Sequence, residues 1–136
     1  MNRSSIVCLF CFLLGIMLLG CVGKNLDFDG DVSTSQMQFT GDADPSIIEK
    51  SIRNHLGQIK WCYERELNAF PTLEGKVTTI FTFDRSGLVQ EAGIKESTVN
   101  NEEMQNCIVK TIVSIKFPSG SKDKIQVIYP FLFKLR

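Results

Sequence analysis

The sequence is poor in histidine, tryptophan and proline. Its 136 residues include one histidine, one tryptophan and four prolines, and no proline precedes Pro45. Basic and acidic residues balance at 15 each, which argues against a strongly basic nucleic-acid binder. No phosphate-binding G-x-x-x-x-G-K-[ST] loop occurs. The length excludes a TIM barrel and a dinucleotide-binding enzyme with a separate substrate domain, and it suits one small domain.

Apolar residues are concentrated at the N-terminus. Of the first 20 residues 14 are hydrophobic, and Arg3 stands ahead of the nearly unbroken apolar run Ile6–Leu19. A short charged region before an apolar stretch is typical of an export signal, and this stretch is short for a bilayer span, which needs about 20 residues. We therefore expect residues 1–20 to be a signal peptide.

The end of this segment, Leu18-Leu19-Gly20-Cys21, resembles the lipobox of bacterial lipoproteins. The resemblance implies that diacylglycerol is attached to the Cys21 thiol and that a peptidase cuts before this residue. Several acyl chains then hold the chain on a membrane, since each buried CH₂ contributes about 0.8 kcal/mol. Val22 stands where an aspartate would imply inner-membrane retention, which favours the outer membrane with the domain facing the periplasm. The alternative is an uncleaved anchor helix whose cysteine is incidental.

Residues 21–44 form an acidic segment. After Cys21 it carries five aspartates and one lysine, a net charge of −4, and no helical or strand period persists. This composition predicts a flexible tether between the lipid and the domain. Leu26–Asp31 resembles part of a calcium loop but does not complete the EF-hand pattern.

The remaining residues, 45–136, show the helix and strand periods of one domain. Asp44 before Pro45 predicts a helix start, and Asn100 with Glu103 has the spacing of a capping box. Apolar stripes at three- and four-residue steps predict two helices. The first stripe comprises Ile48, Ile52, Leu56, Ile59, Tyr63 and Leu67, and the second Met104, Cys107, Ile108, Thr111, Ile112 and Ile115.

Three stretches with a two-residue alternation predict strands, over residues 76–84, 88–95 and 125–134. A turn at residues 84–87 joins the first two, with Gly87 available for a positive φ angle. The expected order is α-β-β-α-β, an α+β domain in which two helices pack on one face of a three-stranded antiparallel sheet.

Cys62 and Cys107 would remain after signal removal, each on the inner flank of one predicted helix. An exported protein meets an oxidising compartment, which favours a disulfide between them. A redox-active pair is the alternative, although such pairs usually have Cys-X-X-Cys spacing. A zinc site would need more ligands than His55 supplies.

Residues 47–133 carry a run of motifs in one order: Ile59–Glu64, Leu67, Pro71, Leu73–Val77, Phe81, Gly87, Val89, Ser97-Thr98, Cys107, Phe117-Pro118 and Tyr129–Phe131. These motifs resemble the AgmX/PglI C-terminal domain family, whose pattern is similar to that of the C-terminal domain of TonB energy transducers. The resemblance implies an extracytoplasmic α/β domain used for protein contacts, in some members linked to gliding motility, and no enzyme. TonB transducers have an inner-membrane helix and a proline-rich stretch, which this chain replaces with a lipid anchor, so binding is implied and energy transduction is not.

The last predicted strand is a candidate docking edge for a partner's extended segment, because an edge strand presents unpaired amides and carbonyls. Pro130 lacks an amide hydrogen, which predicts an edge position or a bulge, although a proline there also opposes strand addition. The same side chains are expected in the core where they face the helices. The candidate partner-binding residues are Ile125, Val127, Tyr129, Phe131 and Phe133.

No pattern favours an enzyme, a cofactor or a metal. His55 lies beside the apolar stripe and is expected to be a half-buried structural residue. Trp61 is expected to be a packing residue, whereas an exposed Trp61 would indicate an interface anchor. We therefore expect a lipid-anchored envelope protein that binds another envelope protein, in a motility or transport-related complex. The alternative is a structural lipoprotein that supports an outer-membrane assembly without a discrete peptide site.

Overall fold

A computed structural model describes residues 30–34, 36–118 and 123–136 of the chain. The predicted signal at residues 1–20 and the predicted lipidation site Cys21 lie outside these ranges. Among the described residues, no helix is both long enough and apolar enough to cross a bilayer. The described elements are β1 (Gly30–Thr34), β2 (Gln38–Thr40), α2 (Pro45–Arg53), α3 (Leu56–Leu67), β3 (Gly75–Phe83), β4 (Val89–Ser97), α4 (Glu102–Ser114) and β5 (Ile125–Leu135).

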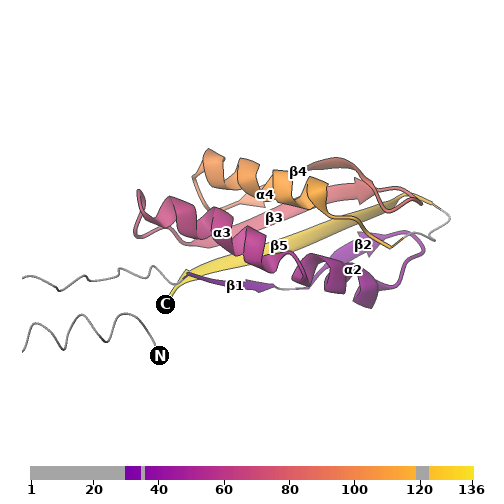
Figure 1. Ribbon diagram of the computed structural model, residues 1–136, viewed down its shortest axis with the longest axis horizontal. Coiled ribbons are helices and arrows are strands. Elements are labelled where there is room, and N and C mark those ends of the chain that lie inside the picture. The colour runs from indigo at the N-terminus through magenta and orange to yellow at the C-terminus, as the bar shows by residue number, and fades with distance from the viewer. Residues whose placement is uncertain (1–29, 35, 119–122) are drawn as a thin grey trace, which may run out of the picture.

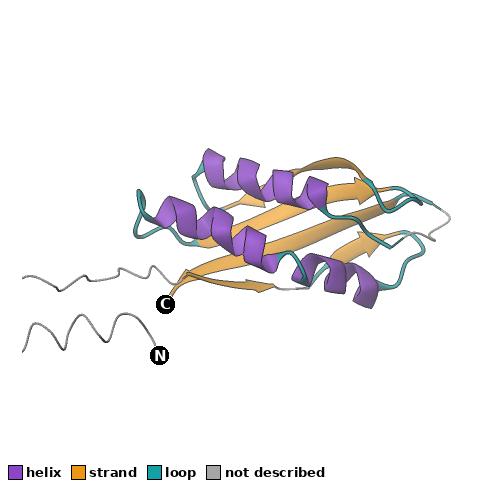
Figure 2. Cartoon of the chain, viewed as in Figure 1, coloured by secondary structure: helices purple, strands orange, loops and turns teal. Residues whose placement is uncertain are grey.

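These elements form two layers. The helices α2, α3 and α4 lie on one face of an antiparallel sheet, and no described element covers the other face (Figures 1 and 2). The mixed α+β class is confirmed. The expected two helices and three strands are too few, because the described part of the chain forms three helices and five strands.

The strand β5 lies at the centre of the sheet. The strand order is β1-β5-β3-β4, and β2 also pairs with β5, on the side where β1 lies. The prediction of an edge strand at residues 125–134 is therefore wrong.

Pro130 is accommodated at the centre of the sheet by an interruption on one side of β5. Three residues of the chain separate β1 from β2, whereas only Tyr129 and Pro130 separate their register partners on β5. The ladder on this side is thus interrupted where β5 lacks an amide hydrogen. This is the bulge alternative that a proline within a strand predicts.

The acidic segment before the domain contributes two strands, so the expectation of a spacer without strands is wrong. β1 and β2 pair antiparallel with the two halves of β5. Met37 and Phe39 are partly buried and pack against the core. Met37 and Phe39 alone are too few to be recognised in the sequence as a strand pattern. This segment becomes a strand because it pairs with β5.

The first predicted helix is divided into α2 and α3 at Asn54 and His55. Asparagine and histidine are weak helix formers, and Gly57 follows them, so the break falls where helix propensity is lowest. The apolar stripe continues across the break: its members are buried in both helices, apart from Leu56, which is partly buried.

Side-chain caps fix the start of α2 and α4. The Asp44 carboxylate accepts a hydrogen bond from the Ser46 amide at 2.9 Å, which confirms the predicted start of α2. For α4 the cap is Asn101, one residue later than predicted, and its side chain accepts from the Met104 amide at 2.7 Å. The hydrogen bonds from Ser46 lower the pKa of the Asp44 carboxyl.

The core fills the space between the sheet and the helices. Val77, Thr79, Phe81 and Phe83 of β3 are buried toward the helices, as the predicted alternation requires, and Thr78 on the other face is buried too, at 7 % exposure. Phe117, which follows α4, stacks on Phe83 with ring centroids 4.4 Å apart and closes one end of the core. The turn before β4 packs tightly against it: Gly87 has φ +83°, as expected, and the Phe117 amide donates to the Gly87 carbonyl at 2.9 Å.

Candidate functional site

The two cysteines predicted to pair form a disulfide between α3 and α4. The Cα atoms of Cys62 and Cys107 are 5.7 Å apart. Cys62 is fully buried, whereas Cys107 is half-buried and reaches the outer surface of the helix layer. The disulfide fixes α3 against α4 and thereby fixes the surface that the two helices share.

Trp61 is exposed on this surface, so the expectation that it packs in the core is wrong. Its exposed fraction is 56 %. The exposure of Trp61 could have been predicted from the sequence. Trp61 lies two residues from both Ile59 and Tyr63 of the apolar stripe, and two residues turn a helix by about 200°. A side chain so placed points away from the core and toward solvent.

Arg65 lies one helical turn after Trp61 and covers its ring. The guanidinium carbon is 5.1 Å from the ring centroid, a cation–π contact. The same guanidinium also donates to the Glu66 carboxylate at 3.0 Å. Trp61 is thus held against its own helix while much of its surface remains open to solvent.

A hollow of about 350 Å³ lies beside Trp61, between α3 and α4. It combines a tryptophan and an arginine, two residue types enriched at protein interfaces, with hydrogen-bonding and charged side chains of the kind that form an interface rim. The residues that line it are Trp61 and Arg65 from α3, and Glu103, Asn106, Cys107, Lys110, Thr111 and Ser114 from α4.

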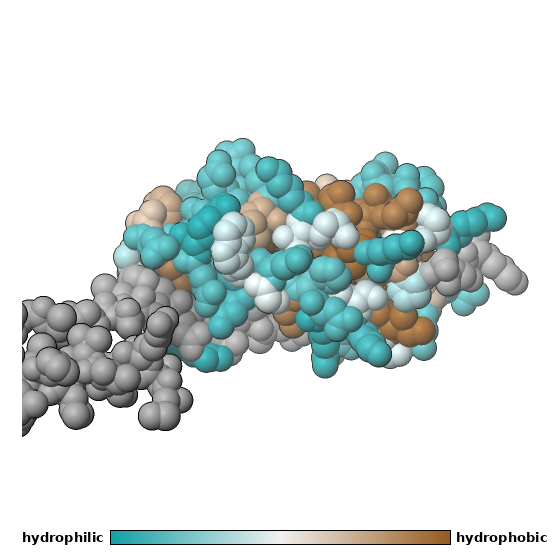
Figure 3. All heavy atoms as spheres, in the orientation of Figure 1, coloured by the Kyte–Doolittle hydropathy of each residue, from teal (hydrophilic) through white to brown (hydrophobic). Residues whose placement is uncertain are grey.

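The helix-bearing face also has an apolar area near the C-terminal end of α4 (Figure 3). Val113, in the last turn of α4, is half exposed, and so is Leu88, which pairs with Lys116 just after this helix. Polar side chains cover most of the rest of this face (Figure 3).

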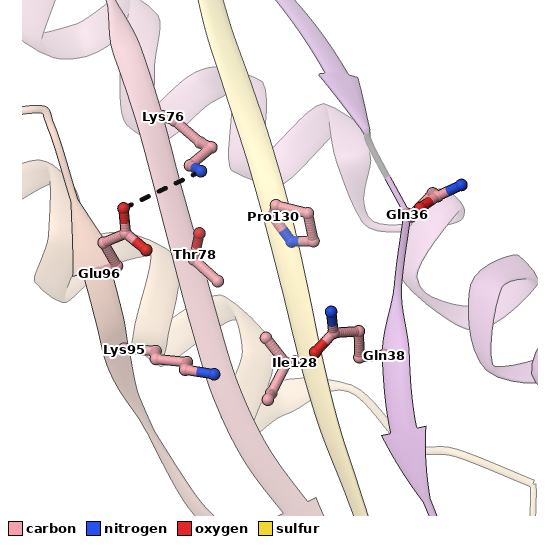
Figure 4. A pocket seen from close by; sticks show the side chains of 8 residues that line it. All are labelled: Gln36, Gln38, Lys76, Thr78, Lys95, Glu96, Ile128 and Pro130. Carbon is pink, nitrogen blue, oxygen red and sulfur yellow. Dashed lines mark ion pairs between the residues drawn. The ribbon is translucent and has the colours of Figure 1, made fainter.

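The uncovered face of the sheet has a second hollow, of about 470 Å³ (Figure 4). Ile128 and Pro130 of β5 and Thr78 of β3 form its floor. Lys76 and Glu96 approach to 4.0 Å on one side of it. None of the residues that line this hollow is aromatic.

A third hollow, of about 740 Å³, lies between α2 and β2. Glu49 and Arg53 line it and form an ion pair with each other at 2.6 Å. It is less suited to docking than the hollow beside Trp61, because Glu49 and Arg53 neutralise each other and its one aromatic residue, Tyr129, is 1 % exposed.

The predicted partner-binding residues do not form a surface. Each has an exposed fraction of 1 % or less, because the strand that carries them is central and their side chains point toward the helices. The prediction that they bind a partner at an edge is therefore wrong, and the alternative that they are core residues holds. They are Ile125, Val127, Tyr129, Phe131 and Phe133.

His55 lies at the break between α2 and α3. Its ring Nδ1 is 2.8 Å from the Ser51 carbonyl oxygen, and the side chain is partly buried, as expected of a structural histidine. Glu64 forms an ion pair with Lys60 at 3.4 Å. Among the described residues, no cluster of three or more histidine, cysteine, aspartate or glutamate side chains is placed to hold a metal ion.

Neither protein-family models, nor curated proteins, nor solved structures match this chain.

The disulfide should contribute substantially to stability. Chain-entropy estimates for a loop closed across a separation of 45 residues give about 4 kcal/mol. We expect the C62S/C107S variant to melt well below the oxidised protein, and to match the wild type reduced with dithiothreitol. Thermal unfolding followed by circular dichroism measures both. Equal melting temperatures for the variant and the oxidised protein would show that the disulfide does not stabilise the fold.

Proposed function

We propose that the chain is a lipid-anchored protein of a bacterial cell envelope whose domain binds another envelope protein through the helix face around Trp61. The observation that carries the docking site is the exposure of Trp61 beside the hollow between α3 and α4. Tryptophan and arginine are the residues most enriched among binding hot spots, and here they lie together.

The disulfide supports this site as a docking surface. Binding costs less free energy when the contacting groups are already ordered. Cys107 lines the hollow and is bonded to Cys62, the residue next to Trp61, so the two sides of the hollow are covalently joined within one helical turn of the proposed anchor. An extracytoplasmic location supplies the oxidising conditions that this bond needs.

The envelope location itself rests on the sequence. The lipobox-like end of the N-terminal segment, Leu18-Leu19-Gly20-Cys21, supports export and lipidation, and the outer membrane facing the periplasm is the proposed site. The motifs that resemble the AgmX/PglI C-terminal domain, and through it the TonB C-terminal domain, support protein binding in a motility or transport-related complex. They favour neither catalysis nor a cofactor, so we propose no enzymatic activity.

Lipidation at Cys21 has a direct test. The C21S variant of the whole chain lacks the thiol that would carry diacylglycerol, so it should not incorporate labelled palmitate, and signal cleavage should be lost. The wild type should incorporate the label and sediment with membranes, and C62S/C107S, which keeps Cys21, should also be labelled. Equal labelling of C21S and the wild type would contradict the lipoprotein proposal.

Docking at Trp61 is tested by crosslinking the tagged, full-length chain in its native membranes and purifying it. The W61A variant should lose its crosslinked partner, with affinity reduced about 30-fold, because removing a hot-spot tryptophan costs about 2 kcal/mol or more. F70A is the matched control: Phe70 is 52 % exposed and lies in the loop after α3, so this variant should keep the partner.

Three outcomes would count against this site. If W61A retained the partner at the wild-type yield, the helix face around Trp61 would not be the docking surface. If a charge at the other apolar area, in V113K, removed the partner while W61A did not, docking would move to the end of α4. Co-purification of every variant with the same large assembly would favour the structural-lipoprotein alternative.

A further inference from the structure

The outer edge of β4 is the free edge on one side of the sheet. β4 is the terminal strand in the order β1-β5-β3-β4, and in the described part of the chain no strand pairs with its outer edge. Leu88 bridges to Lys116 just before β4 begins, so the open stretch starts at Val89. Unpaired amides and carbonyls along such an edge can accept an added strand.

The side chains of β4 are divided between the two faces of the sheet by its register with β3. Ala92 and Ile94 pair with buried residues of β3 and lie on the helix-bearing face, where both are partly buried against the core. Glu91 and Gly93 pair with β3 residues of the uncovered face. Lys95 also lies on the uncovered face (Figure 4).

This arrangement is self-complementary about Gly93, with an apolar residue on either side of it and opposite charges one position farther out. We propose that β4 pairs antiparallel with β4 of a second copy of the chain, about a two-fold axis at Gly93. Ala92 then faces Ile94 of the other copy, and Glu91 faces Lys95 of the other copy. Because the interface is symmetric, each contact occurs twice, and apolar and opposite-charge cross-strand pairs both stabilise a sheet.

No nearby register places both the apolar residues and the opposite charges across from each other. A slide that moves the axis to Ala92 puts Lys95 opposite Val89 of the other copy and leaves both charges without an opposite charge across the strands. Moving the axis to Ile94 puts Ala92 opposite the charged Glu96. A shift of the pairing by one residue places side chains of opposite faces against each other. The axis at Gly93 is therefore the register that the side chains specify.

The free protein leaves the required groups available. Neither Glu91 nor Lys95 forms an ion pair with another residue in the described ranges of the chain. The Lys95 side chain lies over the uncovered face and can turn toward an added strand, since it has four rotatable bonds (Figure 4). Around Gly93 the uncovered face is open, with no heavy atom within 4 Å of the position that a Cβ would take.

The length of regular strand suits a short interface. Residues 91–94 pair with β3 without a break, and register shifts occur on either side of them. Such irregularities limit how far an added strand can continue. About the axis at Gly93, the regular stretches of the two copies overlap at residues 92–94, and the two Glu91–Lys95 pairs lie at the ends of this overlap.

A disulfide trap at the axis tests the pairing. In G93C the two introduced thiols would sit on Cα atoms about 4.5–5.5 Å apart, within the range that a disulfide spans. In E96C, an exposed position of the same strand, the pairing would hold the introduced thiols roughly 20 Å apart. Both variants are expressed as the whole chain, and membranes are run on a non-reducing gel beside the wild type, which reports any bridging by the native cysteines.

We expect most of G93C, but not E96C, to run at twice the wild-type mass, and dithiothreitol to reverse this. Equal dimer bands for the two variants would show random collision and overturn the proposed axis. The absence of a dimer band in both would overturn the pairing itself.

Charge reversal provides a second, independent test in which the fold is not at risk, because both positions are exposed. E91K or K95E alone places like charges opposite each other twice and should weaken the dimer about tenfold in sedimentation of the detergent-solubilised chain. The E91K/K95E double variant exchanges the two signs and should restore it. A wild type that sediments as a monomer at all concentrations, or a double variant no tighter than the singles, would contradict the proposal.

Discussion

The structure depends on the pairing of β3 with β5 along their full shared length, from Gly75 opposite Phe133 to Phe83 opposite Ile125. This pairing aligns the buried side chains of both strands beneath the helices, so that one continuous core forms. With β3 on one side of it, β5 has its other side free for β1 and β2, and β3 has its other side free for β4. As a result, β1 and β2 form one edge of the sheet and β4 forms the other, and the outer side of β4 remains unpaired in the described part of the chain.

The surfaces of the domain follow from the same constraint. The helices bury their apolar stripes on the face that β3 and β5 fill, and the disulfide then joins α3 to α4 within that layer. Trp61, on the opposite side of α3, is left in solvent because every position facing the core is already taken by the stripe. The proposed partner site and the proposed self-pairing edge are separate features, one on the helix layer and one at the rim of the sheet. A membrane-anchored dimer would therefore present two copies of the Trp61 surface.

Much of the domain could be predicted from local patterns. These patterns predicted the helix start at Asp44, the buried alternation of β3, the turn at Gly87 and the pairing of Cys62 with Cys107. Each depends on a short-range period, a cap or the redox environment.

The order of the strands could not be predicted, because period-two alternation identifies a strand but not its neighbours. Pro130 pointed to an edge or a bulge, and the gap between β1 and β2 that accommodates it is a long-range feature. β1 and β2 escaped prediction because each needs β5 to become a strand. The exposure of Trp61, by contrast, was readable from its spacing to Ile59 and Tyr63.

Hydrogen exchange of the backbone amides tests the central position of β5 most directly. A strand paired on both sides has nearly all its amides protected, whereas an edge strand leaves every second amide open to solvent. The account predicts slow exchange for consecutive amides of Gln126–Ile128 and Phe131–Phe133, the two stretches of β5 that are paired on both sides. Rapid exchange at every second residue of β5 would contradict it, since that pattern would make β5 an edge strand and leave β1 and β2 unpaired.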